Sequence, residues 1–293
     1  MSGARANLGE LVVTAVVGRV TTPVMAENPY EVGADGTPFV PVGAGGICYN
    51  VKIGMAAMGW AADQVEPGVS IANPTASAND ALAVFACIGN PVTVRTGAAA
   101  GATGAVIGKH ESFRAYKHVL VHVGDDVLEQ VAPGDELLVR ACGRGMAIEG
   151  APGAACHSLG PELWRAWEPD TADGRVSVTV TRILPPEVVG MGSGRVAAAT
   201  SFAIQTKDED VVREHGLADL RLGDIVAVRD WDATHYTGYR DGGVTVGVVA
   251  SGDSPLAGNG PAVTVLLSAG DGSLEPRVAP DANLATMLGL GLG

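Results

Sequence analysis

The sequence has 293 residues, of which 47% are hydrophobic but only 4% aromatic, and its formal net charge is −13. Such an acidic chain repels phosphate groups, which argues against nucleic acid and anionic membranes as partners. No apolar run approaches the ~18 residues of a membrane helix. The first apolar segment lacks the features of a signal peptide, and the four cysteines form no close pair. We therefore expect a cytoplasmic protein with reduced thiols.

Valine-rich runs bounded by glycine and proline predict strands along the whole chain, because such residues favour extended structure and tight turns. These runs are 11–20, 91–97, 118–124, 136–143, 175–184, 225–231, 244–251 and 262–268. Several of them alternate apolar and polar residues, which is typical of sheets with one solvated face. The sequence therefore predicts an α+β, β-dominated fold made of two barrel-like or sandwich-like β domains with few short helices.

Helical signals are few. Residues 78–88 predict one buried helix with Asn79 or Asp80 near its N-cap. Residues 207–215 begin with an acidic first turn and are followed by Gly216, which favours a second short helix ending at that glycine.

One internal pattern occurs in both halves of the chain. Residues 131–140 (VAPGDELLVR) align without gaps on residues 220–229 (LRLGDIVAVR). In each copy a glycine allows an unusual backbone geometry, and the aspartate that follows, Asp135 or Asp224, can accept hydrogen bonds from the amides of its own turn. A strand then leaves the turn, so the repeat predicts one barrel-like unit in each half.

A domain boundary is expected within residues 185–199, where a proline pair ends a strand and a GMGSG run follows. We therefore predict an N-terminal β-rich domain, 1–190, and a smaller C-terminal β-rich domain, 191–293.

Chemistry-bearing side chains gather in two neighbouring glycine-rich stretches of the first half. These contain Tyr49, Asn50, Trp60, Asp63 and Glu66. Glycines let the backbone approach a ligand closely, and the two carboxylates could share a proton or a metal. The alternative is a glycine-rich connection with solvated charges.

Two loops after successive strands of the second half are also rich in polar groups. They carry His235 and Tyr239 in one loop, and Asp253 and Asn259 in the next. Loops held by rigid strands commonly carry binding groups, so we expect them to contribute to a site, with plain loop chemistry as the alternative.

The glycine-rich stretch 93–110 does not predict a phosphate-binding loop. Thr103 stands where that motif needs its first glycine, and His110 replaces the required serine or threonine. A β-hairpin is favoured instead.

His118 and His122 lie on the same face of the predicted strand 118–124. They are weak candidates for metal ligands, because no fixed-spacing metal motif accompanies them. No metal or other cofactor is predicted.

Segments throughout the chain resemble the bacterial and archaeal domain-of-unknown-function family 4438. They are GGICYNVKIG, GWAADQVEPGVSI, ACIGNPVTVRTG, GAVIGKH, LRLGDIVAVRD, YRDGGVTVGVV and SGDSPLAGNGPAVTVLL. The resemblance implies an N-terminal domain with a smaller C-terminal companion, and it implies no reaction. It also implies two departures, since members of the family tend toward histidine at the positions of Gln64 and Asn259.

We predict a small-molecule enzyme that performs cofactor-independent acid–base chemistry, such as hydrolysis, elimination or cyclisation, in a cleft between the domains. The predicted catalytic residues are Asp63, Glu66, Tyr49 and His235, and the predicted substrate-binding residues are Asn50, Trp60, Tyr239, Asp253 and Asn259. The alternative is a non-catalytic small-molecule-binding or structural protein. In either case we expect a homo-oligomer that covers its sheet edges.

Overall fold

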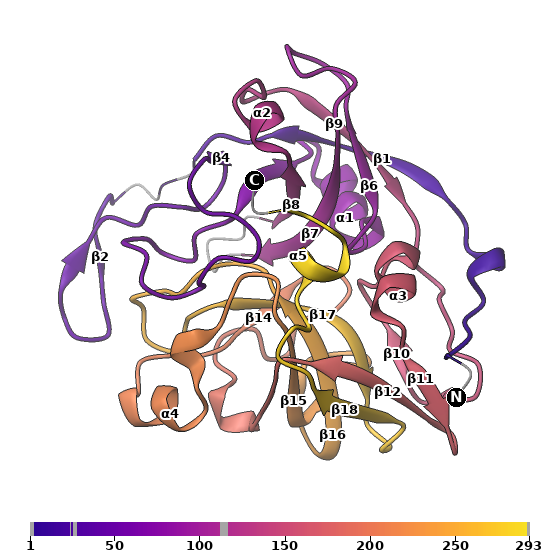
Figure 1. Ribbon diagram of the computed structural model, residues 1–293. Helices are drawn as coiled ribbons and strands as arrows, with labels where there is room; N and C mark the ends of the chain where they lie inside the picture. Colours follow the sequence, from indigo (N-terminus) through magenta and orange to yellow (C-terminus); the bar gives the residue numbers. More distant parts are fainter. Residues whose placement is uncertain (1–2, 24, 26–27, 112–116, 292–293) are drawn as a thin grey trace.

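The computed structural model describes residues 3–23, 25, 28–111 and 117–291. Within these ranges the chain is β-dominated, and its α-helices have ten residues or fewer. Figure 1 shows the strands of the first half above those of the second half, with the C-terminal segment crossing from one to the other. This arrangement confirms the predicted β-dominated α+β fold. No helix in the described ranges is long and apolar enough to cross a membrane.

The first half contains a closed six-stranded antiparallel barrel. Around the ring its strands are β1 (Thr14–Val20), β9 (Glu136–Ala141), β6 (Pro91–Val94), β7 (Thr103–Glu111), β8 (Lys117–Val123) and β5 (Gly68–Ala72). The ring closes because β5 pairs again with β1, through Ala72 with Arg19 and Ile71 with Val20. The short β4 (Ile47–Cys48) pairs with β5, while β2 (Glu31–Val32) and β3 (Pro38–Phe39) form a separate hairpin. Closure leaves few exposed edges in this half.

The second half is organised around a six-stranded sheet. Its strands are β10 (Ala155–Cys156), β17 (Ala262–Ala269), β16 (Gly238–Val249), β15 (Ile225–Asp232), β13 (Arg182–Leu184) and β14 (Ser201–Ala203), of which β14 pairs with β17. A smaller sheet joins β11 (Asp170–Ala172), β12 (Arg175–Val180) and β18 (Leu274–Val278). Strands β10 to β13 lie before the predicted domain boundary at residue 190. However, β10, β12 and β13 pair with β17, β18 and β15, which lie after it. The sheets therefore divide differently from the predicted domains.

The repeated Gly-Asp turn is the same structure in both halves. Gly134 and Gly223 have φ angles of +94° and +88°, which only glycine adopts readily. Asp135 accepts a hydrogen bond from the Ala132 amide at 2.9 Å, and Asp224 accepts one from the Arg221 amide at 2.9 Å. Strands β9 and β15 follow directly. The predicted turns and the predicted barrel in the first half are confirmed.

The helices are α1 (Ala76–Phe85), α2 (Asp125–Leu128), α3 (Pro161–Trp167), α4 (Glu209–Glu214) and α5 (Leu284–Met287), with 3-10 turns at Leu8–Glu10, Pro186–Val188 and Leu217–Asp219. Helix α1 begins earlier than predicted, with Thr75 as its N-cap. Asn79 lies inside the helix, and its side chain accepts a hydrogen bond from the Asn73 amide instead. Helix α4 agrees with the prediction, since Asp208 caps it and Gly216 follows in the left-handed conformation.

The predicted hairpin in residues 93–110 is confirmed, because β6 and β7 pair antiparallel. Strand β7 of the barrel also makes hydrogen bonds to β17 of the second half. The hydroxyl of Thr264, on β17, accepts a hydrogen bond from the Lys109 amide and donates one to the Lys109 carbonyl, both at 2.9 Å. This contact holds the residues on either side of Lys109 in a fixed position between the two sheets.

Candidate functional site

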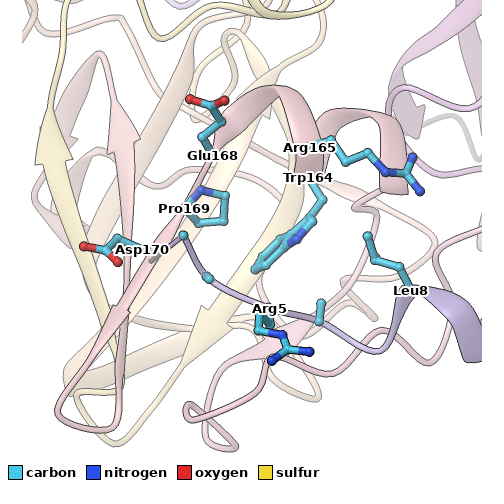
Figure 2. A pocket seen from close by; sticks show the side chains of 10 residues that line it. Arg5, Leu8, Trp164, Arg165, Glu168, Pro169 and Asp170 are labelled. Atoms are coloured by element: carbon cyan, nitrogen blue, oxygen red, sulfur yellow. The ribbon is translucent and has the colours of Figure 1, made fainter. Parts of the chain in front are cut away.

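An open groove with a volume of about 740 Å³ lies between the N-terminal segment and α3. Figure 2 shows its charged side chains pointing apart, with Arg165 and Glu168 directed away from Arg5. Trp164 is nearly buried there and packs against the core. Because no polar groups converge on a common point, size alone does not make this groove the functional site.

A buried carboxylate is the centre of the densest polar cluster in the described chain. The side chain of Glu66 is 1% exposed and accepts hydrogen bonds from four groups. They are the Gly45 amide at 2.8 Å, the Ser70 hydroxyl at 2.5 Å, Nδ1 of His110 at 2.6 Å and Nδ1 of His118 at 3.0 Å. Four donors use all the acceptor positions of a carboxylate, so the charge of Glu66 is fully compensated without water.

Strand register brings the two histidines together. His110 on β7 and His118 on β8 are direct cross-strand partners in the antiparallel pair. Glu66 lies just before β5, the strand on the other side of β8. Three neighbouring segments of the barrel therefore supply the carboxylate and both imidazoles.

The second ring nitrogen of His110 also faces an oxygen. Its Nε2 lies 3.2 Å from Oε1 of Gln64. The amide is oriented by its other end, because Nε2 of Gln64 donates to the Gly260 carbonyl at 2.7 Å. Both ring nitrogens of His110 thus face oxygen atoms, one of a carboxylate and one of an amide.

The second half of the chain completes the cluster through Asn259. Its Nδ2 donates to Oε1 of Gln64 at 3.3 Å. Gln64 itself has a φ angle of +49°, an uncommon conformation for a residue other than glycine. A small cavity of about 10 Å³, at the lower limit for holding one water molecule, lies beside both amide side chains. The two positions at which this chain departs from the family resemblance are therefore in contact with each other.

The electrostatics favour an ion pair between Glu66 and His118. Burial raises the pKa of Glu66, but the charge of His118 and the hydrogen bonds from both histidines outweigh it and hold the pKa far below 4.5. Burial lowers the pKa of His118, but the carboxylate of Glu66 outweighs it and leaves the pKa above 6.5. The two shifts together favour the charged form of the pair, a carboxylate and an imidazolium.

His118 also lines a cavity of about 350 Å³. The other residues around it are Arg19, Val20, Thr21, Thr22, Ala72, Asn73 and Pro74. All of them belong to the first half of the chain. The ring that contacts the buried carboxylate therefore borders a space large enough for a small metabolite.

Asp63 and Glu66, predicted as a pair of carboxylates, have separate partners. Oδ1 of Asp63 accepts a hydrogen bond from the Ser254 hydroxyl at 2.6 Å, and Asp63 is buried at the contact between the halves. None of the hydrogen bonds between described residues joins it to Glu66. The left-handed turn at Gln64, between the two acids, directs the chain so that each acid has its own environment.

The other predicted residues of the first half lie outside the cluster. Tyr49 and Asn50 are exposed on the surface. The indole nitrogen of Trp60 donates to the Ala56 carbonyl at 2.7 Å, and its ring packs against the core. These contacts fold the glycine-rich segment on itself.

Of the predicted residues in the second half, Asn259 reaches the Glu66 cluster through its side chain, and Asp253 reaches it through its carbonyl, which accepts a hydrogen bond from the Gln64 amide at 2.7 Å. His235 lines a different cavity, and Tyr239 is 68% exposed. Asp253 is held by the Thr206 hydroxyl and by Lys207, whose Nζ lies 3.3 Å from it.

His118 and His122 do not act together in this structure. His118 is bound to Glu66, whereas His122 lies opposite Ala105 and is only partly buried. Burial and the nearby Lys52 lower the pKa of His122 despite the attraction of Asp125. No group of three or more His, Cys, Asp or Glu side chains in the described ranges is arranged to hold a metal ion.

His110 and Gln64 are the residues of the cluster that residue chemistry alone did not assign to a site. Their signal is the strand register. Antiparallel pairing of β7 with β8 makes His110 and His118 cross-strand partners, and a carboxylate in a neighbouring segment is then the natural counter-charge.

Comparisons with known proteins cover nearly the whole chain. Residues 30–165 match the N-terminal part of a domain of unknown function, DUF4438, and residues 166–288 match its C-terminal part. The crystal structure of TM1086 is 36% identical in sequence and has a TM-score of 0.91, with 97% of this chain and 99% of that chain covered. The search of curated proteins finds no match. The family division at 165/166 precedes the predicted boundary, in agreement with the pairing of β12 and β13 in the second half. The chain therefore belongs to the DUF4438 family.

Proposed function

We propose that the protein is a small-molecule enzyme in which His118 transfers a proton to or from a substrate held in the cavity beside it. The observation that supports this most directly is the position of the His118 ring. It lines a cavity of about 350 Å³, while its Nδ1 lies 3.0 Å from both carboxylate oxygens of the buried Glu66.

Glu66 is a positioning residue in this proposal. A carboxylate that already accepts four hydrogen bonds is a poor base, but it fixes the ring orientation of a neighbouring histidine and stabilises its protonated form. The raised pKa of His118 favours its protonated form, which is the form that a general acid needs. After it has released its proton, the same ring is the base for the return step.

His110 supports this arrangement from a second side. Its Nδ1 lies 2.6 Å from Oε1 of Glu66, and Gln64 contacts the other ring nitrogen. Asn259 and the Gly260 carbonyl hold Gln64 in place. Residues of the second half thereby help to position the Glu66 cluster, while the proposed substrate cavity is lined by residues of the first half.

The lining of the cavity is mainly apolar with a few polar groups. Thr22 is one of these, and Arg19 adds a positive charge, part of which Glu136 neutralises at 3.0 Å. Such a lining suits a small molecule that has both an apolar part and a polar group. Hydrolysis, elimination and cyclisation each need one proton transfer of the kind that His118 offers.

A conversion screen tests the proposal. Wild-type protein is incubated with pools of lactones, amides and hydroxy acids, and mass spectrometry detects the products. For any substrate found, His118→Asn should reduce turnover by about 100-fold or more, whereas His122→Asn, on the same strand but without a bond to Glu66, should leave it unchanged. Equal turnover in folded His118→Asn would contradict the proposal. Ligands that bind without conversion would support the non-catalytic alternative.

A further inference from the structure

Another cavity shares no lining residue with the cavity beside His118. It has a volume of about 290 Å³ and is lined by Arg144, His157, Val196, Ala198, Thr234, His235 and Tyr236. Its size is at the lower end of the range for small-molecule sites. His235 and Tyr236 are exposed at its rim, whereas His157 is 7% exposed.

His157 has a polar atom without a partner. Its Nε2 is buried and makes no hydrogen bond with any described residue. A buried ring nitrogen without a partner costs about 1–3 kcal/mol, so such atoms commonly mark the position of a ligand or water. His157 is among the residues that line the cavity, so a ligand there would lie beside this ring.

Positive charge is concentrated around this ring. Arg144 donates to the His157 carbonyl at 2.8 Å, and none of the ion pairs between described residues involves Arg144. Behind the cavity wall lies Lys109, 1% exposed, whose Nζ donates to the Ser158 hydroxyl and to the Ala198 carbonyl at 2.9 Å. This clustering is unusual in a chain with a net charge of −13.

The local acid does not neutralise these cations. Asp232 is the acidic group that acts on His157, and its carboxylate is already bound by Arg240 at 2.9 Å and by the Thr234 hydroxyl at 2.6 Å. Burial, followed by the charges of Arg144, Lys109 and His235, lowers the pKa of His157 to about 4 despite Asp232. Burial also lowers the pKa of Lys109 to about 8. Burial is the main cause of both shifts, and the charge of Arg144 adds to each.

We propose that this cavity is a binding site for a small oxyanion, such as the phosphate or carboxylate group of a metabolite, with Arg144 and His157 as its principal ligands and His235 at its entrance. An anion there supplies the partner that Nε2 of His157 lacks and the charge that Arg144 lacks. The site is separate from the Glu66 cluster, because none of the residues that line the cavity belongs to that cluster. Lys109 lies on the side of this site, whereas the next residue of β7, His110, contacts Glu66. The inference does not depend on the proposed reaction.

Calorimetric titration with two probes tests the site. Inorganic phosphate and succinate represent the two sources of an oxyanion, and sodium chloride at matched ionic strength is the control for screening. We expect saturable binding of at least one probe. Arg144→Gln should weaken it by about tenfold or more, because a charge-assisted hydrogen bond is lost. Arg140→Gln, which removes an exposed arginine of β9, should bind as the wild type does.

Two further measurements keep the test decisive if Arg144→Gln folds poorly. His235→Gln changes an exposed residue and should weaken binding severalfold. In NMR spectra the ring protons of His157 should titrate at higher pH when the probe is bound, since an anion stabilises the imidazolium. The absence of saturable binding by both probes, or an unchanged affinity in folded Arg144→Gln and His235→Gln, would overturn the proposal.

Discussion

Oε1 of Glu66 lies 2.6 Å from Nδ1 of His110, and the two side chains are 1% and 2% exposed. A carboxylate so completely removed from water is held by its hydrogen-bond donors, and its loss leaves His118 without its counter-charge. Glu66→Gln should therefore lower the free energy of unfolding by about 3 kcal/mol or more. Asp63→Asn, which disturbs one hydrogen bond from Ser254, should lower it by about 1 kcal/mol. Chemical denaturation of both variants gives the comparison, and similar losses would contradict it.

The stabilisation by Glu66 and His118 should depend on pH. The folded-state pKa of Glu66 is below 4.5, so its contribution is present above pH 4.5 and is lost as the pH falls further. The folded-state pKa of His118 is above 6.5, so its contribution is complete below pH 6.5 and is lost as the pH rises through that raised pKa.

The stability difference between the wild type and Glu66→Gln should thus be largest between pH 4.5 and 6.5. Denaturation curves of both proteins across acidic and alkaline pH measure it. His157, with its pKa of about 4, is present in both proteins and cancels in the difference. A difference that increases above pH 6.5 would rule out the ion pair.

Gly45 should be needed both for its backbone conformation and for its small size. Its φ angle is +77°, and an added Cβ would lie 2.8 Å from the Thr22 carbonyl oxygen and 3.3 Å from Cε1 of His118. Gly59 has a φ angle of +87° but nothing within 4 Å of an added Cβ. Gly59→Ala should cost about 1–2 kcal/mol, and Gly45→Ala should cost more and displace His118. Thermal unfolding and His118 NMR shifts separate the two effects, and equal losses in both variants would contradict the contact.

Two histidines in place of the amide pair should create metal affinity. Gln64 and Asn259 contact each other, and Gln64 contacts Nε2 of His110. Imidazoles at both positions would supply zinc ligands beside His110, and histidine tolerates the left-handed backbone of position 64. We expect zinc to raise the melting temperature of Gln64→His with Asn259→His. The control, Asn50→His with Gln130→His, adds two exposed imidazoles and should show no such increase.

The β2–β3 hairpin should contact a second copy of the chain. It is an isolated two-stranded unit, which is marginally stable alone, and Tyr30, Val32 and Val42 in and around it are each about 60% exposed. Light scattering should give a mass above that of one chain, and Val32→Lys should lower it. Val12→Lys changes an equally apolar exposed residue outside the hairpin and should not. A wild-type mass equal to one chain would refute the contact.

Features that depend on neighbouring residues could be predicted from the sequence. The Gly-Asp turns, the hairpin of β6 and β7, and the capped helix α4 each rest on side chains that act within a few positions of one another. The start of α1 was misplaced because Thr75 caps it, while Asn79 is engaged with Asn73 from within the helix.

The site depended on contacts over long distances in the sequence. Glu66 was identified from its glycine-rich surroundings, but its partners His110 and His118 come from two other strands. Asn259 reaches Gln64 only because the two halves pack together. A high local concentration of polar residues was not a sufficient signal for the site. Tyr49 and Tyr239 lie in loops rich in polar residues, yet both side chains are exposed.

The closure of the barrel by β1 has a consequence during synthesis. β1 leaves the ribosome first, whereas β9, its long pairing partner, is the last strand of the ring to emerge. Until then β1 has only its short pairing with β5, at Arg19 and Val20. The nascent chain must therefore carry an open, valine-rich sheet edge through the translation of the rest of the barrel, the stage at which chaperone binding and aggregation compete.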